Sequence, residues 1–492
     1  MRKYTLILAE KPKAAERITK ALSNGKYRVL NYNGLKVYEF SNYACVAALG
    51  HLFKLDTNDK KWYYPVFDVK WYPITRERKG ISKYIKALRE IGKFADDIII
   101  ATDYDIEGDV IGYNILRFIF NRQNAKRAKF SSLTESEIKR AFQNLMNSLD
   151  FGQVYAGLTR HYLDFYWGIN LTRALTLVSN SNFVISCGRV QTPTLNLILQ
   201  REEEIRNFVP KDFWVIKALI EKNNQRFSAE YYEGKIFDES KAKKIFDESN
   251  KAKFAIVSDI EAKKVFIKPE PPFNLTTLQS EAYRLFKFSP QKTLKIGEEL
   301  YLKGYITYPR TSSEKLPKGI NLKSILEGLF LQKDYSKFVE KIFSKGSLRF
   351  VEGKKDDPAH PAIIVTGEIP EYKKMSIEEK KLYELIARRF LACFYDDLVL
   401  LEQKAIFYVN GYKFISKGRV IEKEGWLEVY PKSVEEKFLP KLEKGENLIL
   451  LKIDLIKDKT KPPKRYNLSD LIKLMEVNRL GTKGTRAEII ET

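Results

Sequence analysis

Residues 97–108 read Asp97-Ile-Ile-Ile-Ala-Thr-Asp103-Tyr-Asp105-Ile-Glu107-Gly108, and this stretch decides the fold of the first part of the chain. The apolar run before Asp103 is typical of a buried strand. Apolar residues then recur at helical spacing, at Val110, Ile111, Ile115, Phe118 and Ile119. A buried strand followed by a helix is the repeating unit of open α/β sheets, so this part of the chain is predicted to form one.

Three carboxylates, Asp103, Asp105 and Glu107, lie between the predicted strand and helix. Alternate side chains of an extended segment point the same way, so Asp103 and Asp105 are expected to face one space. Their mutual repulsion needs a compensating charge. Because no His or Cys is nearby in the sequence, a hard cation bound by oxygen, Mg²⁺, is the predicted ligand. The alternative is an acidic helix start that favours the helix dipole and binds nothing.

The chain begins with a similar unit. Tyr4-Thr-Leu-Ile-Leu-Ala9 predicts a buried strand, and Pro12 opens a helix. Ligands of open α/β sheets gather at the carboxyl ends of the strands, where Glu10 and Asp103 are both expected. Lys11 could neutralise a phosphate there or protonate a leaving hydroxyl, although an ordinary surface lysine is the alternative.

A second chemical segment reads Leu300-Tyr-Leu-Lys-Gly304-Tyr-Ile-Thr-Tyr308-Pro-Arg310-Thr-Ser312. Pro309 biases Tyr308 toward an extended conformation, which aims Tyr308 and Arg310 to the same side. A phenol has an intrinsic pKa of about 10, so a nucleophilic tyrosine needs cationic help. Arg310 could supply that help while gripping a phosphate. The alternative is a half-buried tyrosine beside an arginine salt bridge, which the segment alone favours among 28 tyrosines.

The rest of the chain divides by pattern. Residues 151–210 are predominantly helical in pattern, whereas residues 213–235 and 397–455 alternate strand-like segments with turns such as Asn410-Gly411. We expect the last two stretches to pair into one β domain. The helical residues 268–396 would then be an insertion, which the stiff segment Pro269-Glu-Pro-Pro272 introduces.

Composition limits the class of protein. Lys and Arg number 86 against 63 Asp and Glu, a surplus of 23 positive charges over 492 residues. A nucleic-acid partner and a solvated lysine-rich surface explain this surplus about equally well. The cysteines Cys45, Cys187 and Cys393 form no C-x-x-C pair, so neither a disulfide framework nor a cysteine zinc site is predicted. The N-terminal apolar run is too short for a signal peptide or a membrane span.

The acidic motif Asp103-x-Asp105-x-Glu107-Gly108, together with Glu10, resembles the signature of the Toprim fold that topoisomerases, bacterial-type primases and some nucleases share. The resemblance implies phosphoryl-transfer chemistry. It also implies Mg²⁺ ligands at Glu10, Asp103, Asp105 and Glu107, with Glu10 and Lys11 in catalytic roles.

Ile306-Thr-Tyr-Pro-Arg-Thr-Ser312 is similar to the active-site segment of type IA DNA topoisomerases, and most like that of archaeal topoisomerase III and reverse gyrase. The resemblance implies Tyr308 as the nucleophile and Arg310 as its catalytic partner. The family pattern usually has Asp where this chain has Ser312.

Other family-like segments follow in the expected order. They include Asp164-Phe-Tyr-Trp-Gly-Ile-Asn170-Leu-Thr-Arg173, Ser186-Cys-Gly-Arg189-Val-Gln191, Ala359-His-Pro and Gly484-Thr-Arg486. The resemblance implies a groove for single-stranded DNA, with hydrogen bonds and positive charge but no base-reading code. The implied DNA contacts are Asn170, Arg173, Ser186, Arg189, Gln191, His360 and Arg486.

The resemblance implies a toroidal, multidomain fold of α/β, α and β domains. Its parts are an N-terminal, Rossmann-like Toprim domain at 1–150, a helical DNA-binding domain at 151–210 and 463–492, a β domain at 211–267 and 397–462, and the tyrosine-bearing helical domain at 268–396. Family members continue beyond the residue that matches Thr492, so a truncated C-terminal part is expected.

The implied activity is cleavage of one DNA strand through a 5′-phosphotyrosine bond, strand passage and religation, which relaxes negative supercoils or decatenates DNA. Mg²⁺ is the expected cofactor. No ATP is expected because no G-x-x-x-x-G-K-[ST] loop occurs, and no zinc is expected. The expected partner is single-stranded or underwound DNA, with a helicase as a further partner. A cytoplasmic, nucleoid-associated monomer without membrane contact is expected.

Two other classes stay open on the sequence. A Toprim nuclease or primase would use the same carboxylates without a nucleophilic tyrosine, and a non-enzymatic clamp would bind single strands without cutting them. A reverse gyrase module is disfavoured because no helicase-like segment precedes the Toprim-like part.

Overall fold

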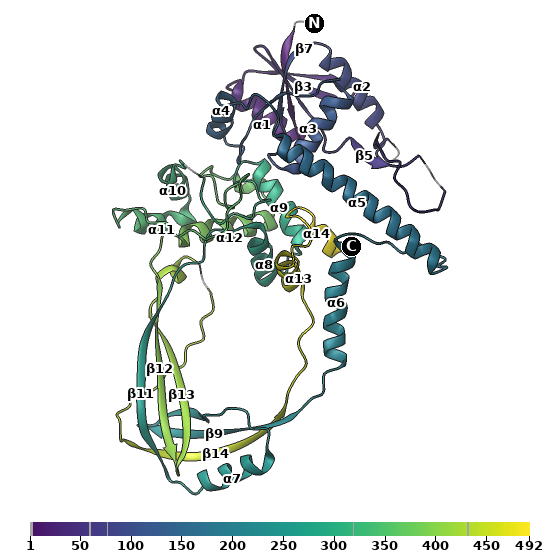
Figure 1. The fold of residues 1–492 in the computed structure, drawn as a ribbon. Coiled ribbons are helices and arrows are strands. Elements are labelled where there is room, and N and C mark those ends of the chain that lie inside the picture. The colour runs from purple at the N-terminus through teal and green to yellow at the C-terminus, as the bar shows by residue number, and fades with distance from the viewer. Residues whose placement is uncertain (1–2, 59–60, 76, 318, 431) are drawn as a thin grey trace.

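The computed structural model describes residues 3–58, 61–75, 77–317, 319–430 and 432–492. The elements form a ring (Figure 1), with an α/β region at one end and a β-barrel at the other. Two helical regions connect these ends. The ring arrangement agrees with the toroidal, multidomain architecture that the sequence predicts.

The N-terminal region is a six-stranded sheet with helices on both faces. Its strand order is β2-β3-β4-β1-β7-β8. Strands β4, β1, β7 and β8 run parallel to one another, and β3 runs antiparallel to both of its neighbours, β2 and β4. The strands are β1 (Tyr4–Ala9), β2 (Arg28–Tyr32), β3 (Leu35–Phe40), β4 (Tyr43–Ala47), β7 (Ala95–Ala101) and β8 (Lys126–Arg127). A small hairpin, β5 (Phe53–Asp56) and β6 (Lys70–Pro73), lies apart from this sheet.

Successive residues of the central strands bury opposite faces of the sheet. Ile7 and Ile99 pack in the cluster that contains α1 (Pro12–Leu22) and α4 (Glu135–Gln143). Leu6 and Ile98 pack in the cluster that contains α2 (Ile81–Gly92) and α3 (Ile106–Phe118). The continuous apolar runs of β1 and β7 follow from this burial on both faces.

The second region is helical. It contains the long helix α5 (Phe151–Val178), α6 (Gln191–Arg206), α13 (Leu468–Val477) and α14 (Arg486–Glu491). Several large apolar side chains of α5 and α6 are exposed, among them Trp167, Val178 and Leu195. In the described part of the chain, no helix has the length and apolar character required to span a membrane.

The two predicted β stretches form one closed barrel, in the order β10-β13-β12-β11-β14-β9. Its strands are β9 (Asp212–Lys222), β10 (Gln225–Tyr231), β11 (Phe254–Ile267), β12 (Leu398–Val409), β13 (Tyr412–Lys423) and β14 (Asn447–Lys459). The predicted hairpin at Asn410-Gly411 joins β12 to β13. The sequence did not predict α7 (Glu239–Ser249), which packs on the barrel, or the short η2 (Gly425–Glu428).

The chain between β11 and β12 is helical and carries Tyr308. It contains α8 (Leu275–Phe286), α9 (Pro290–Leu302), α10 (Leu322–Phe330), α11 (Lys333–Phe343), η1 (Tyr372–Lys374) and α12 (Ile377–Ala392). One apolar cluster runs from the α1 face of the N-terminal sheet into the core of these helices. The Tyr308 region is therefore packed directly against the sheet that carries the acidic motif.

Candidate active site

Two carboxylates lie at the same edge of the N-terminal sheet. The parallel strands β1 and β7 pair with Ala9 opposite Ala101, and Glu10 and Asp103 follow these positions. Asp103 is 4% exposed, and its Oδ2 has no hydrogen-bond partner among the residues that the structure describes. Burial and the charge of Asp103 raise the pKa of Glu10 to about 8. The edge thus holds buried negative charge that a cation would relieve.

Lys11 supplies a positive charge among these acids. Its Nζ lies 3.7 Å from Glu10 Oε1, 3.9 Å from Asp103 Oδ2 and 3.3 Å from Glu298 Oε2. Burial alone would lower the pKa of Lys11, but the nearby carboxylates outweigh it and raise that pKa. The ammonium therefore stays charged at neutral pH and can act as a proton donor.

A buried arginine fixes the backbone turn that carries Asp103. The fully buried Arg127 guanidinium donates to the carbonyl oxygens of Thr102 and Asp103, both at 2.7 Å. The same guanidinium pairs with Asp109 in α3 at 2.8 Å. Arg127 therefore holds the turn between β7 and α3 in place and restricts the backbone conformation of Asp103.

Tyr308 reaches this acidic turn from the inserted helical region. Its Oη donates to Asp105 Oδ2 at 2.7 Å, and its backbone N donates to the carbonyl of Ser131 at 2.8 Å. Tyr301 Oη donates in the same way to Asp103 Oδ1 at 3.2 Å. Two tyrosines of the inserted helical region thus each donate a hydrogen bond to one aspartate of the N-terminal region.

The surroundings of Tyr308 keep its phenol protonated. Burial raises the pKa of Tyr308 well above its usual value, the carboxylates of Asp105 and Asp103 raise it further, and Arg310 only opposes them. Arg310 is itself bonded to Glu298, with Nε at 2.9 Å and Nη2 at 2.5 Å from Oε1. The net effect is opposite to the cationic activation that the sequence predicts, because burial and the two carboxylates outweigh the charge of Arg310.

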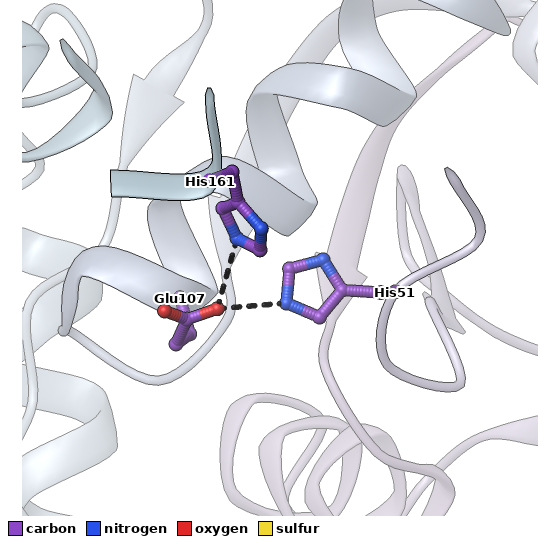
Figure 2. A group of neighbouring side chains, drawn as sticks. All are labelled: His51, Glu107 and His161. Carbon is purple, nitrogen blue, oxygen red and sulfur yellow. Dashed lines mark hydrogen bonds and ion pairs between the residues drawn. The ribbon is translucent and has the colours of Figure 1, made fainter. Parts of the chain in front are cut away.

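Glu107 departs from the predicted metal set. Its Oε2 lies 3.0 Å from His51 Nε2 and 3.2 Å from His161 Nε2 (Figure 2), and its Oε1 is bonded to Arg160. Burial alone would raise the pKa of Glu107. The hydrogen bonds with His161 and His51 and the charge of Arg160 outweigh it and lower the pKa far below the usual range.

The four predicted metal ligands consequently do not converge on one point. In the described ranges, the only group of three or more His, Cys, Asp or Glu side chains with ligand atoms all within 4.8 Å of one another is His51, Glu107 and His161. Glu107 lies in the first turn of α3, and its carboxylate is bonded to Arg160 and His161 of α5 and to His51 of the loop after β4. No histidine is near these acids in the sequence, but the fold brings His51 and His161 from distant segments to Glu107.

His360, which the resemblance implies as a DNA contact, lies against the predicted nucleophile. Its ring centroid is 4.5 Å from that of Tyr308, its Nδ1 is 3.2 Å from Ser131 Oγ, and its Nε2 has no partner. Burial lowers the pKa of His360 to about 4, so the ring is neutral at pH 7. A neutral ring with one free nitrogen can accept or donate a hydrogen bond beside the phenol.

Asp357 supplies a carboxylate next to Ser312, where the family pattern usually has Asp. Its Oδ2 accepts from the backbone N of Ser312 at 2.9 Å and from its hydroxyl at 3.0 Å. The same oxygen is paired with Lys483, from the loop before α14. The carboxylate that position 312 lacks is thus replaced by one from a separate loop.

Most of the charged side chains described above line one cavity of about 930 Å³. It lies between the N-terminal sheet, α5, the inserted helices and the C-terminal loop. Neither Tyr308 nor Asp103 lines it, so the hydroxyl of Tyr308 is covered in this conformation. The charged and polar lining includes Glu10, Lys11, His51, Asp105, Glu107, Arg160, His161, Arg310, His360, Lys483 and Arg486.

Comparison with known proteins identifies this arrangement. Residues 5–133 match the Toprim domain family, and residues 148–492 match a DNA topoisomerase family. The chain belongs to the type IA DNA topoisomerases. It is 43% identical to DNA topoisomerase 1 of Pyrococcus horikoshii and 44% identical to DNA topoisomerase 1 of Methanocaldococcus jannaschii, over 99% of its own length. It spans 73% and 64% of the lengths of these two relatives.

A solved structure resembles the whole arrangement. The full-length topoisomerase I of Thermotoga maritima matches with a TM-score of 0.77 at 28% identity, over 99% of this chain and 77% of the other. The predicted family, the Toprim fold and the class of enzyme, an isomerase acting on DNA, are confirmed by these likenesses.

The acidic edge of this type IA topoisomerase fits a divalent cation. Asp103 Oδ2 is buried without a hydrogen-bond partner, and the pKa of Glu10 is raised by burial and by the charge of Asp103. Both observations are those expected of oxygen ligands that lack their counter-ion. The residues that would hold Mg²⁺ are Glu10, Asp103 and Asp105, whose ligand atoms do not all lie within 4.8 Å of one another in this conformation and would have to move closer around the ion.

Two predicted DNA contacts hold the structure of the topoisomerase together instead of facing solvent. The Asn170 amide bonds the backbone N and O of Val66, at 2.5 and 3.0 Å. Arg173 is buried, donates to the carbonyl of Tyr63 and stacks near Trp62. Both side chains bind residues 62–67 to α5. Their direct contact with DNA stays a prediction.

The other predicted contacts are more open. Ser186 and Arg189 are exposed, although Arg189 pairs with Asp164 at 2.8 Å. Gln191 is the first residue of α6, and Arg486 Nε donates to the carbonyl of Leu480 at 2.9 Å. Their contact with DNA likewise stays a prediction.

Sequence reasoning missed several residues of the site, namely His51, Arg160, His161, Glu298, Tyr301, Asp357 and Lys483. One signal was available: the chain has only three histidines, and all three line the cavity. His51 also follows β4, whose carboxyl end meets that of β1 at the same edge. The remaining residues are brought in from distant segments that no local pattern connects.

Proposed function

We propose that this chain cleaves one strand of DNA without ATP, through a 5′-phosphotyrosine bond on Tyr308. The hydrogen bond between Tyr308 Oη and Asp105 Oδ2, at 2.7 Å, is the observation that carries the proposal. It joins the predicted nucleophile of one region to the acidic motif of another. No contact of this kind is needed by a nuclease or primase that uses the carboxylates alone.

The chemistry of the first step follows from these contacts. Tyr308 Oη attacks the phosphorus, its proton passes to Asp105, and the bond from phosphorus to the 3′ oxygen breaks. Lys11, whose raised pKa keeps it charged, donates a proton to that leaving oxygen. Arg310 offsets the charge on the phosphate once Glu298 releases it.

Religation reverses these transfers. The 3′ hydroxyl returns its proton to Lys11 and attacks the phosphotyrosine, and the departing phenolate takes the proton back from Asp105. Because the ester conserves the free energy of the broken bond, no ATP is needed. Mg²⁺ held by Glu10, Asp103 and Asp105 would stabilise negative charge at the phosphate and organise the ends.

Between the two steps the inserted helical region must leave the sheet so that a second strand can pass through the ring. Strand passage would relax negative supercoils or decatenate DNA. The predicted partner is single-stranded or underwound DNA, with the chain acting as a monomer, alone or with a helicase, in the cytoplasm and at the nucleoid. The four predicted domains, 1–150, 151–210 with 463–492, 211–267 with 397–462, and 268–396, are the moving units in this proposal.

Tyr308→Phe tests the proposal. Supercoiled plasmid and Mg²⁺ are incubated with the variant, and both the relaxed product and the covalent adduct are expected to vanish while the melting temperature is unchanged. Tyr301→Phe is the matched control, since it removes the neighbouring phenol, and it should still form the adduct.

Two other outcomes of these experiments would favour the alternative functions. Nicking by Tyr308→Phe at the rate of the unmodified chain would indicate a Toprim nuclease. Intact, bare DNA after incubation with the unmodified chain would indicate a single-strand-binding clamp.

A further inference from the structure

Three side chains outside the proposed reaction meet beside the cavity. His51 comes from the loop after β4, Glu107 from the first turn of α3 and His161 from α5. Figure 2 shows both imidazole rings turned toward the same carboxylate oxygen of Glu107. We propose that His51, Glu107 and His161 form a second cation site, separate from the acidic edge, that takes a transition-metal ion of the Zn²⁺ class.

The spacing of the three ligand atoms suits such an ion. His51 Nε2 and His161 Nε2 lie 3.0 and 3.2 Å from Glu107 Oε2, and all ligand atoms lie within 4.8 Å of one another. Neighbouring ligands of a tetrahedral zinc ion, with bonds of about 2.0–2.1 Å, are roughly 3.3 Å apart. The two distances from histidine nitrogen to Glu107 Oε2 therefore already suit a zinc ion. The two histidine nitrogens, which lie within 4.8 Å of each other, would need to be roughly 3.3 Å apart in the bound state.

The surroundings fix the orientation of these ligands. Arg160 holds the other oxygen of Glu107, which leaves Oε2 free to bind as a single ligand atom. The positive charge of Arg160 is offset by Asp164, 3.5 Å from its Nε. The ring of Trp71 packs edge-on against His161 at 5.5 Å. Partners of this kind, which hold ligands in place, commonly accompany metal sites in proteins.

The site is open to solvent on the cavity side. The side chains of His51, Glu107 and His161 are 32%, 21% and 28% exposed, and all three line the cavity of about 930 Å³. An ion can therefore enter, and water can fill the fourth position that three protein ligands leave.

The donor set selects the class of ion. Imidazole nitrogen favours Zn²⁺ and similar transition metals, whereas Mg²⁺ prefers the oxygen ligands of the acidic edge. The expectation of no zinc was based on the absence of cysteine motifs and did not consider histidines that meet only in the fold. A bound ion would join the β4 loop and α3 to α5, across one wall of the cavity.

The competing explanation is a hydrogen-bond clamp, in which both Nε2–H groups donate to Glu107 and no ion binds. The two explanations differ in the tautomer required. A metal takes the unprotonated Nε2, with the proton on Nδ1, whereas the clamp keeps the proton on Nε2. Only direct measurement of metal binding separates them.

The test is Zn²⁺ titration of the full chain by calorimetry, in excess Mg²⁺ and after removal of transition metals. One Zn²⁺ per chain is expected. His161→Gln, whose amide can still donate to Glu107, should weaken binding at least 10-fold, and His51→Gln should do the same. Zn²⁺ should also raise the melting temperature of the unmodified chain but not that of either variant.

Two controls separate this site from the others. His360→Asn, which removes the only remaining histidine, and the double change Asp103→Asn with Asp105→Asn should leave Zn²⁺ affinity unchanged. Zn²⁺ binding that survives in both His161→Gln and His51→Gln, or that disappears with the aspartate changes, would overturn the proposal. So would the absence of Zn²⁺ binding to the unmodified chain, which is the outcome expected of a clamp.

Discussion

At the scale of single residues, the Tyr308 phenol donates a hydrogen bond to a carboxylate, and its neighbouring cation, Arg310, is paired with another residue. Asp105 Oδ2 accepts its hydrogen bond, while Arg310 is engaged by Glu298. A carboxylate at 2.7 Å is placed to take the phenolic proton as attack begins. In the proposed mechanism, activation of Tyr308 therefore depends on Asp105 and on release of Arg310, which the negative phosphate of a bound strand would favour.

Asp105→Asn is expected to slow formation of the covalent adduct by about 10²- to 10⁴-fold, because general-base catalysis contributes that range. The amide oxygen still caps α3, but the NH2 group that replaces Oδ2 can only donate to Tyr308 Oη and cannot take its proton. The rate is measured in a single turnover with saturating single-stranded DNA and Mg²⁺. A rate within threefold of the unmodified chain would contradict a role for Asp105 as the base.

His360 should make the fold sensitive to mild acid. The pKa of His360 is lowered from 6.5 to about 4 by burial, so the unfolded chain takes up a proton at higher pH than the folded chain. Stability is intact above pH 6.5 and falls by up to roughly 3 kcal/mol as the pH drops toward 4. Because other groups also titrate, the measurement is the difference in urea unfolding between the unmodified chain and His360→Asn. Parallel pH profiles would contradict this account.

Asp357→Asn should destabilise the contact between the inserted helices and the C-terminal loop. The Asp357 side chain is 2% exposed and pairs with Lys483. Removal of the Asp357 charge should cost less than the roughly 3–5 kcal/mol of a fully buried pair, because the Lys483 side chain is 35% exposed and stays partly solvated. The double change Asp357→Asn with Lys483→Met, measured by thermal unfolding, should recover much of the loss. No recovery would mean that the pair itself contributes little.

The residues at strand ends were predictable, but their partners were not. Glu10 and Asp103 follow from the rule that functional groups gather at the carboxyl ends of parallel strands. Glu107 lies four residues after Asp103, yet it turns toward His51 and His161, which are 56 and 54 positions away. Local spacing carries no information about such contacts, and metal binding by the set of four carboxylates stays a prediction.

At the scale of elements, the turn between β7 and α3 is the most constrained part of the site. Gly108 lies so close to the turn that an added Cβ would be 2.1 Å from the carbonyl oxygen of Asp103. No side chain fits there unless the backbone moves. The glycine therefore sets the position of both Asp103 and Asp105.

Gly108→Ala is expected to displace this turn, to lower the melting temperature and to weaken Mg²⁺ binding at least 10-fold. The matched control is Gly168→Ala in α5, where the nearest atom would be 3.7 Å away and the helix should gain up to about 1 kcal/mol. Mg²⁺ affinity is measured by calorimetry on each variant. Equal Mg²⁺ affinities in the two variants would contradict the role given to the turn.

The elements themselves were largely readable from periodicity. Continuous apolar runs predicted β1 and β7, and the Asn410-Gly411 turn predicted the hairpin of β12 and β13. The closure of six strands into a barrel was not predictable, because it depends on pairing between β9 and β14, which lie more than 200 residues apart. Helix α7 was missed because it lies within residues 211–267, which were assigned to the β domain as a whole.

At the scale of the whole molecule, the structure is a closed conformation. One apolar cluster joins the N-terminal sheet to the inserted helices, and Tyr308, Tyr301 and Glu298 cross the same boundary. Tyr308 is 2% exposed and does not line the cavity. In the proposed reaction, DNA must therefore separate these regions at least locally, and the surplus of 23 positive charges favours its entry.

Affinity for single-stranded DNA should fall steeply with salt, because each phosphate contact releases counterions. About six phosphate contacts predict a loss of roughly 10²- to 10³-fold between 50 and 200 mM salt. The measurement is fluorescence anisotropy of a labelled oligonucleotide in EDTA, which prevents cleavage. A loss of less than threefold would contradict phosphate-led binding.

The central claim is that Tyr308 becomes joined to a 5′ phosphate. It is tested most directly by denaturing the reaction of the full chain with single-stranded DNA and Mg²⁺, digesting the trapped adduct and mapping the modified peptide by mass spectrometry. The account predicts one nucleotide-bearing peptide, which contains Tyr308, and a free 3′ hydroxyl on the other fragment. A nucleotide on Tyr301 or any other residue, or a linkage to the 3′ end of the break, would contradict it.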